Sequence, residues 1–251
     1  MVNPTQWKST FVALGYDLFH EVLAEIPTFD FLLTPGVEKV YEQDGITLRS
    51  IYGFHENPTF LDWLNQQHII KEIVTEIIGE EVYIHQSKVN LKNQQESSVW
   101  PFHRDFPFWN VFDHFSHNHF LNVVIYLDDV VEDSGALELI PKSHLEFLAR
   151  EKADKDIDYS LEGSAGSDLL FRFSETEIAY FKEKYGTFTT VGKKGSILLF
   201  NPDIIHGSGN STLDFSRKIM ILTFNTCANK PDAVSPRPNY LCNQNQSPLP
   251  W

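Results

Sequence analysis

Cysteine is scarce in this chain of 251 residues, and both cysteines, Cys227 and Cys242, lie near its C-terminal end. Two thiols can form one bridge at most, which excludes the dense disulfide framework of a small secreted domain. Long apolar runs are missing too: no stretch of about 20 apolar residues is present to cross a bilayer. The first ten residues carry no apolar run typical of a signal peptide. We therefore expect free thiols, no membrane association and a cytoplasmic location.

Positive charge is also in short supply, because 20 Lys and Arg face 34 Asp and Glu, for a formal net charge of −14. A nucleic-acid surface needs a basic face, so this balance argues against a nucleic-acid partner. A small molecule is the partner we expect instead. The length suffices for one sizeable domain with a substantial core, and we predict a single domain over residues 1–251.

Helical periodicity is concentrated in the first 80 residues. Apolar residues recur at close to helical spacing over 11–26 and 60–78, and residues 46–54 favour a short strand between them. Thr59 is a candidate N-cap for the second helix, and Gly79 is a plausible C-terminal stop. We expect a mainly helical flank over residues 1–80.

Short β-rich runs separated by turn residues follow from residue 81 onward. They are residues 82–91, 118–127, 137–140, 187–191, 196–201 and 218–225. A polar insertion at 150–180 interrupts them, and residues 226–251 form a C-terminal tail. Helices followed by many short strands predict an α+β protein. Its core over 81–225 is expected to be a double-stranded β-helix, a cupin-like jelly roll.

Two histidines and one aspartate form the most informative pattern in the chain. Residues two apart in a strand face the same side, so His103 and Asp105 can reach one metal together while Arg104 points away. His206 follows a second strand, and Gly207 allows tight passage of the backbone. Two imidazoles and one carboxylate are the facial ligand set that holds iron(II) and leaves its other positions open. Structural zinc favours closed tetrahedral sets instead.

Arg217 lies eleven residues after His206, at the start of the last β-rich run. An arginine keeps its proton and offers a planar fork to a carboxylate. Ser208, Gln86 and Asn90 can add neutral donors around the same ligand. An ordinary surface salt bridge is the alternative for an isolated arginine, but the position after a His-Gly-Ser turn favours the ligand role.

A second group of histidines, His114, His117 and His119, has a spacing that also suggests metal binding. The chain has ten histidines, so such groupings arise easily by chance. We expect these three to face solvent or to lie near the substrate rather than to bind the metal. His144 is expected to be a structural turn residue.

Five motifs, in order, resemble the phytanoyl-CoA dioxygenase superfamily of iron(II)/2-oxoglutarate oxygenases, and most of all its ectoine-hydroxylase-like members. That group includes hydroxylases of free aliphatic amino acids. The resemblance covers roughly residues 80–225 and extends to the tail residues 237–241. Lys142 stands where the family usually has a glycine. The motifs are residues 86–90, 102–106, 134–144, 195–200, and 206–208 with Arg217.

The resemblance implies a role for each candidate residue. The three metal ligands named above would bind iron(II), and Arg217 would hold the distal carboxylate of 2-oxoglutarate, assisted by Ser208, Asn90 and Gln86. The remaining groups would contact the substrate, and they are Trp109 and Phe102. A core aromatic is the alternative for Trp109. With O2 as the oxidant, the implied reaction converts 2-oxoglutarate to succinate and hydroxylates an unactivated carbon.

The substrate we favour is a small polar metabolite, a free amino acid or a similar zwitterion. Halogenating relatives lack the ligand carboxylate, whereas this chain keeps Asp105, which favours hydroxylation. One alternative is a tailoring oxygenase that acts on a larger natural product or a carrier-bound amino acid. Another is a non-catalytic cupin-like metal-binding module, which would need neither Arg217 nor Ser208. A zinc hydrolase would need a general base near the metal, and the spacing assigns none.

Overall fold

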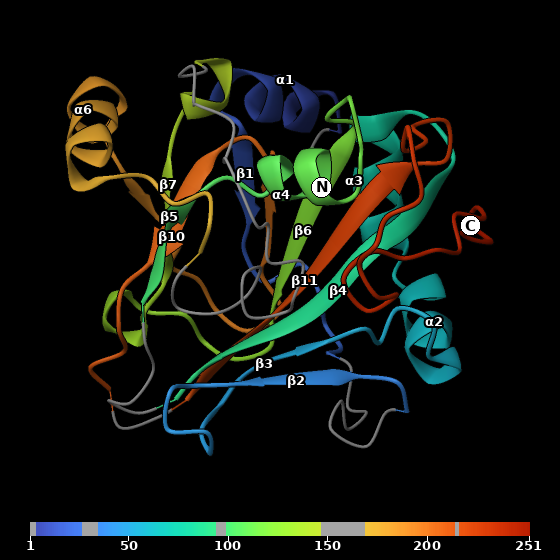
Figure 1. Cartoon of the computed structure of the whole chain (residues 1–251), viewed down its shortest axis with the longest axis horizontal. Helices are drawn as coiled ribbons and strands as arrows, with labels where there is room; N and C mark the ends of the chain where they lie inside the picture. The colour runs from blue at the N-terminus through green and yellow to red at the C-terminus, as the bar shows by residue number, and fades with distance from the viewer. Residues whose placement is uncertain (1–3, 27–34, 94–98, 147–168, 214–215) are drawn as a thin grey trace.

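Two antiparallel sheets form the framework of the protein (Figure 1). The computed structural model describes residues 4–26, 35–93, 99–146, 169–213 and 216–251. The larger sheet has seven strands in the order β1-β9-β6-β11-β4-β3-β2, and the smaller has four in the order β5-β10-β7-β8. Their bounds are β1 Tyr16–Phe19, β2 Glu38–Tyr41, β3 Leu48–Tyr52, β4 Val82–Lys92, β5 Trp100–His103, β6 Phe120–Tyr126, β7 Leu137–Ile140, β8 Phe188–Thr189, β9 Ile197–Phe200, β10 Ile205–Ser208 and β11 Arg217–Thr226.

Apolar side chains from both sheets pack between them. Val124 and Ile221 from the larger sheet share one buried cluster with Leu137 and Leu139 from the smaller sheet. The opposite face of the larger sheet packs against helices, because Phe11 and other helical residues share a second cluster with its outward-facing strand residues. The predicted α+β class with a double-stranded β-helix core is confirmed.

Five α-helices lie in the described parts of the chain. They are α1 Pro4–Leu14, α2 Pro58–Asn65, α3 His68–Ile78, α4 Phe106–Phe112 and α6 Glu175–Tyr185, with 3-10 turns at η2 Glu132–Ser134 and η3 Ser143–Leu145. No helix among the described residues combines the length and the apolar character that a membrane span requires. Helices α1, α2 and α3 pack against the larger sheet, whereas α6 packs against β7 of the smaller sheet.

The first predicted helix, over residues 11–26, is wrong beyond Leu14. Gly15 ends α1 in a left-handed conformation with φ of +85°, which favours glycine. The ring of His144 lies where a Cβ at position 15 would be, only 2.4 Å away. The chain then turns into β1, which pairs with β9.

The second predicted helix, over residues 60–78, is two helices separated at residues 66–67. The cap is Asn57 rather than Thr59, because the Asn57 side chain accepts from the backbone N–H of Phe60 at 3.0 Å and Pro58 takes the first helical position. Gly79 ends α3 in the left-handed region, as predicted. The first 80 residues also supply three strands, β1 to β3, to the larger sheet.

The predicted strands of the core agree with the structure to within two or three residues at each end, and β7 matches residues 137–140. Most of the predicted 150–180 insertion lies outside the described residues. Its described end contains α6, whose N-terminus has a capping box between Ser174 and Glu177.

Strands β4 and β11 form a long antiparallel pair in the larger sheet (Figure 1). Their register sets which residues share a face. Arg217 lies opposite Lys92, and Thr223 lies opposite Gln86, with alternate residues between them on the same face. The register then shifts, so that His85 is the extra residue of a β-bulge. Such bulges re-aim side chains next to active sites.

Candidate active site

The three predicted metal ligands converge at one end of the smaller sheet. His103 and His206 are direct cross-strand partners on β5 and β10, and their ring centroids lie 4.3 Å apart. The sequence suggested that Asp105 lies in the same strand as His103. In the structure it lies instead at the N-cap of α4. Its backbone N–H donates to the carbonyl of Pro202 at 2.9 Å, which ties the start of α4 to the turn before β10.

Both histidines are oriented by the backbone. His103 Nδ1 lies 2.7 Å from the carbonyl oxygen of Pro101, and His206 Nδ1 lies 3.1 Å from that of Ile204. A proton on each Nδ1 satisfies these contacts and leaves each Nε2 with a lone pair. The two Nε2 atoms lie 3.5 Å and 3.8 Å from the oxygens of Asp105. All three side chains are buried, and these donors fit one iron(II) ion.

The carboxylate of Asp105 is held from the larger sheet. Asn122 on β6 donates from Nδ2 to Asp105 Oδ2 at 2.7 Å, and Thr223 on β11 donates to Asn122 Oδ1 at 2.7 Å. An aspartate at an N-cap normally accepts from the helix backbone, but this side chain makes no such bond. The N-terminus of α4 therefore lacks a side-chain cap, and the carboxylate of Asp105 faces the two histidines instead.

The protonation states also suit a metal. Burial would raise the pKa of Asp105, but nearby Lys88, His206 and His103 outweigh it and hold that pKa below its usual range. Burial, together with the neighbouring His103, lowers the pKa of His206 to about 3. The site therefore offers an ionised carboxylate and a neutral imidazole at neutral pH, which are the forms that bind metal.

A partly open cavity adjoins the three ligands. One wall is polar and comes from alternate residues of β4: Gln86, Lys88 and Asn90. Other walls are aromatic, and their residues are Tyr52, Trp100, Phe108, Trp109 and Phe200. Such a lining suits a small molecule with both polar and apolar parts.

Arg217 is 2% exposed and lies on the inner face at the far end of β4 and β11. Its Nη2 donates to the carbonyl of Gly135, and burial lowers its pKa to about 10. Within the described residues, Arg217 Nε and Ser208 Oγ are buried donors without a hydrogen-bond partner. Because buried polar groups are normally satisfied, these two atoms point to a polar ligand.

The phytanoyl-CoA dioxygenase (PhyH) family matches residues 16–219 of this chain. The chain belongs to this family. An L-proline trans-4-hydroxylase of Streptomyces griseoviridis is 30% identical over 217 residues, which cover 84% of this chain and 80% of the relative. An ectoine dioxygenase of Nocardia farcinica is 26% identical over 99% of this chain and 90% of the relative.

The crystal structure of EctD from S. alaskensis with 2-oxoglutarate and 5-hydroxyectoine shares the fold, with a TM-score of 0.78 and 22% identity. The alignment covers 99% of this chain and 86% of that one. This PhyH protein is thus an iron(II)/2-oxoglutarate-dependent dioxygenase of the hydroxylase type, with O2 as its further co-substrate. This family membership disfavours the alternative of a non-catalytic cupin-like metal-binding module.

Of the predicted substrate-contacting residues of this PhyH protein, only Trp109 lines the cavity. The structure places Phe102 on the other face of β5 from His103, in a cluster with Phe181 of α6. Lys182 Nζ lies 4.5 Å from the centre of the Phe102 ring on that side. The alternation of side chains along the strand that turns His103 inward turns Phe102 away.

Lys92 is a buried lysine beside Arg217 that the sequence prediction did not include. It is 1% exposed and lies directly across from Arg217. Burial, with Arg217 and Arg49 nearby, lowers its pKa to about 7. The signal was present, because Lys92 continues the alternation of Gln86 and Asn90, the two β4 residues that were predicted.

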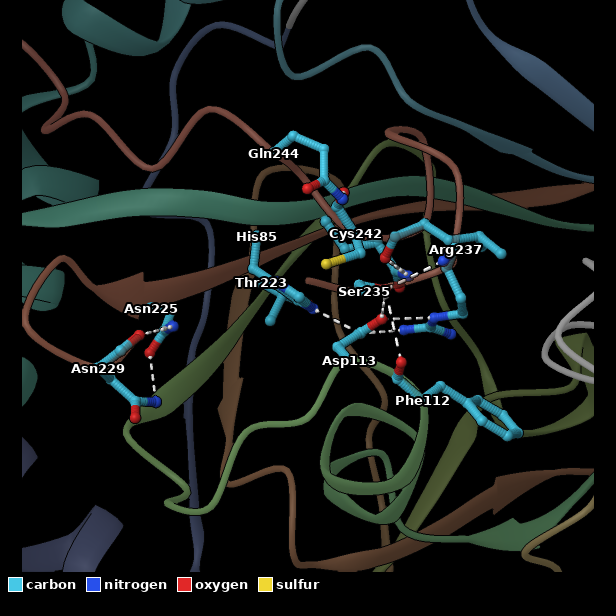
Figure 2. A network of polar contacts seen from close by, with 12 residues as sticks. His85, Phe112, Asp113, Thr223, Asn225, Asn229, Ser235, Arg237, Cys242 and Gln244 are labelled. Atoms are coloured by element: carbon cyan, nitrogen blue, oxygen red, sulfur yellow. Dashed lines mark hydrogen bonds and ion pairs between the residues drawn. The ribbon is translucent and has the colours of Figure 1, made fainter. Parts of the chain in front are cut away.

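A second buried group, also missed, consists of His85, Asp113 and Cys242 (Figure 2). Its donor atoms could bind a metal, but Arg237 donates to both oxygens of Asp113 and claims that carboxylate. Arg237 also lines the cavity. Arg237 follows the last strand in a segment without periodicity; the resemblance extends to residues 237–241, but it assigned Arg237 no role.

The histidines at 114, 117 and 119 belong to neither buried group of donors in the described structure. His117 and His119 are exposed and stack on each other with ring centroids 6.0 Å apart. His144 lies in the 3-10 turn η3, as predicted, and its Nε2 is 3.2 Å from the carbonyl of Val12.

Proposed function

We propose that this protein hydroxylates an unactivated carbon of a small zwitterion, a free amino acid or a cyclic analogue, with iron(II) bound by His103, Asp105 and His206. The observation that carries the proposal is the convergence of these three side chains beside one cavity. When bound, the iron would supply the oxidation, driven by decarboxylation of 2-oxoglutarate to succinate. The protein's own residues orient the two substrates and exclude water.

Arg217 and Lys92 are proposed to receive the distal carboxylate of 2-oxoglutarate. They are two buried cations on neighbouring strands, and a dicarboxylate offsets their mutual repulsion. Arg217 Nε and the Ser208 hydroxyl are donors still to be satisfied in the described structure. Asn90 lines the cavity from β4, two residues before Lys92 on the same face of the strand. Gln86 is proposed to assist less directly, because its Nε2 already donates to the carbonyl of Leu241.

The cavity supports a zwitterionic substrate through its charges. Arg237 is proposed to bind the substrate carboxylate, because this cation lines the cavity and charge-assisted hydrogen bonds to a carboxylate are strong. Among the described lining residues, the only carboxylate is Asp105, which is committed to the metal. The cationic nitrogen would then face aromatic rings such as Trp109 and Trp100. The relatives named for L-proline and ectoine act on compounds of this kind.

The aromatic wall is also proposed to exclude water from the reacting carbon. Trp109 and Phe108 come from α4, directly after the iron-binding carboxylate, and both are nearly fully buried. Apolar rings at this position exclude water from the carbon that is to be oxidised, which protects a reactive oxidant from side reactions. A small substrate held between these rings and Arg237 would have its C–H bonds directed at the metal.

The test is an incubation of anaerobically purified protein with iron(II), 2-oxoglutarate and a panel of free amino acids and ectoine, started with O2. Succinate and hydroxylated products are followed by mass spectrometry. We expect succinate in step with one hydroxylated zwitterion. Succinate without product from any panel member would contradict the substrate class and favour a larger or carrier-bound substrate. No succinate, with iron bound, would contradict the reaction itself.

A cytosolic location is proposed as well. Both cysteines are free thiols in the structure, as is usual in a reducing compartment. Fractionation of cells that express the full chain would test this, and recovery from an oxidising compartment would contradict it.

A further inference from the structure

The chain after β11 folds back onto the cavity and contributes Arg237 and Leu241 to its wall. It is fastened along β4, where Gln86 Nε2 donates to the carbonyl of Leu241 at 2.8 Å and the backbone N–H of Asn243 donates to the carbonyl of His85 at 2.9 Å. Figure 1 shows this C-terminal segment beside β4 and β11. The wall of the cavity is therefore completed by residues outside the predicted core.

Arg237 is held to Asp113 in a fork-to-fork arrangement (Figure 2). Its Nε donates to Asp113 Oδ1 at 2.7 Å, and its Nη2 donates to Oδ2. Ser235 links the same two residues, because its hydroxyl donates to Asp113 Oδ1 at 2.6 Å and accepts from the Arg237 backbone N–H at 3.1 Å. The guanidinium thus has one fixed orientation.

A carboxylate is an unfavourable choice at position 113. Asp113 is the C-cap of α4, where the helix dipole repels negative charge, and its side chain is fully buried. His85 lies 3.4 Å away, but burial lowers the pKa of that ring, so it stays neutral and offers no charge of its own. Arg237 is the charged group that compensates Asp113, and Asp113 compensates Arg237 in return.

We propose that Asp113 is a positioning residue that fixes the guanidinium of Arg237 in the cavity wall and so determines where the carboxylate of the substrate binds. The inference rests on the proposed function, in which Arg237 receives that carboxylate. Without Asp113, a buried guanidinium would lose its partner and move toward solvent or another acceptor. The reacting carbon would then no longer be held opposite the metal site, and small displacements of this kind cost large factors in rate.

A purely structural role makes a different prediction. If the ion pair only fastened the C-terminal segment to α4, its loss would lower stability without changing which substrates are preferred. The two roles are separated by a probe pair that differs only in the group that Arg237 is proposed to bind. L-proline and L-prolinamide form such a pair, with a carboxylate in one and a neutral amide in the other.

The experiment compares wild type, Asp113→Asn, Arg237→Gln and the double variant. For each we would measure the ratio of kcat/KM for L-proline to that for L-prolinamide, the melting temperature and the iron content. Succinate formed without amino acid is followed in every sample, because its loss would identify a failure of the proposed reaction rather than of the role of Asp113. Asparagine keeps the shape of the aspartate, which limits the disturbance of folding.

The wild type is expected to prefer the acid, and Asp113→Asn should lose roughly 10-fold to 100-fold of that preference. Iron content and substrate-independent succinate should stay at the wild-type level. In the Arg237→Gln background, Asp113→Asn should remove no further preference, because the two residues act as a unit. A wild-type acid preference in Asp113→Asn, with a lowered melting temperature, would overturn the proposal. A further loss in the double variant would also overturn it.

Discussion

Helix α4 separates two buried groups of side chains with similar donor atoms. At its N-cap, Asp105 meets His103 and His206; at its C-cap, Asp113 meets His85 and Cys242. In the described structure no lysine or arginine forms an ion pair with Asp105, whereas Arg237 occupies both oxygens of the second carboxylate.

The histidines differ as well. Those of the first group are oriented by backbone carbonyls at Nδ1, while both ring nitrogens of His85 are buried without a hydrogen bond to a described residue. Imidazole and carboxylate therefore do not define a metal site by themselves. A site also requires that no cation claims the carboxylate and that the backbone selects the metal-binding nitrogen.

The largest effect is expected from breaking the first group. Asp105→Ala or His103→Ala should abolish iron binding and turnover, because the loss of one ligand in three leaves the metal poorly held. Iron content after anaerobic dialysis and succinate formation are the measurements. Cys242→Ser, which alters only the second group, is the control and should retain iron. Full activity in either ligand variant would contradict the metal assignment.

The second group should gain the metal-binding ability of the first when its competing cation is removed. Removing the competing cation with Arg237→Ala should allow His85, Asp113 and Cys242 to take up a second divalent metal, with loss of the thiol proton. Anaerobic titration with Co2+ would reveal thiolate coordination through its charge-transfer absorption, which wild type should lack. The double variant with Cys242→Ser is the control and should lack it too. The same absorption in wild type would show that Arg237 does not close this group.

A smaller effect is expected from the residues that orient the metal carboxylate. Asn122→Ala removes the donor to Asp105 and should weaken iron affinity about 10-fold to 100-fold. Ser235→Ala removes the corresponding donor to Asp113 and should leave iron affinity unchanged. Anaerobic iron titration compares the two. Equal iron affinity in both variants would show that the hydrogen bond from Asn122 has no role in holding the ligand.

The smallest effect is expected on the pH dependence of 2-oxoglutarate binding, because the two buried cations Arg237 and Lys92 differ in how they titrate. Arginine side chains are charged at all ordinary pH values, but the pKa of Lys92 is lowered to about 7. As pH rises above that value Lys92 loses its proton, so 2-oxoglutarate affinity should fall by up to about 10-fold per pH unit. Lys92→Met should bind more weakly and with little pH dependence. Anaerobic calorimetry across neutral pH measures this, with Lys218→Met as the control, because Lys218 is a half-exposed lysine on the neighbouring strand β11. A pH-independent wild type would contradict the role of Lys92.

The sequence was sufficient to predict the first group but not the second. His103, Asp105 and His206 lie next to strand patterns, where alternation decides which side chains share a face. The same rule, carried further, would have included Lys92 and excluded Phe102. Asp113 and Arg237 meet through an irregular segment, and His85 enters the interior through a β-bulge. Neither the irregular segment nor the β-bulge produces a periodic pattern in the sequence.

The helical flank shows a similar limit. Apolar spacing continued past Gly15, but the backbone turns there with a positive φ that favours glycine, and His144, far along the chain, packs where a side chain at position 15 would lie. Apolar spacing likewise bridged the break between α2 and α3. In both cases the periodicity reports which residues are buried, while the ends of helices depend on particular residues and on tertiary contacts.

Asp105 and Asp113 are the N-cap and the C-cap of one short helix. Helix α4 therefore fixes the separation between the proposed iron ligand Asp105 and Asp113, which holds the proposed carboxylate anchor Arg237. On the proposed function, the length of α4 would set how many bonds separate the acid group of a substrate from the carbon that reacts. Regioselectivity would then depend on the backbone of this helix. Adding or deleting one residue in α4 would rotate and shift one end against the other and move the point of attack along the substrate.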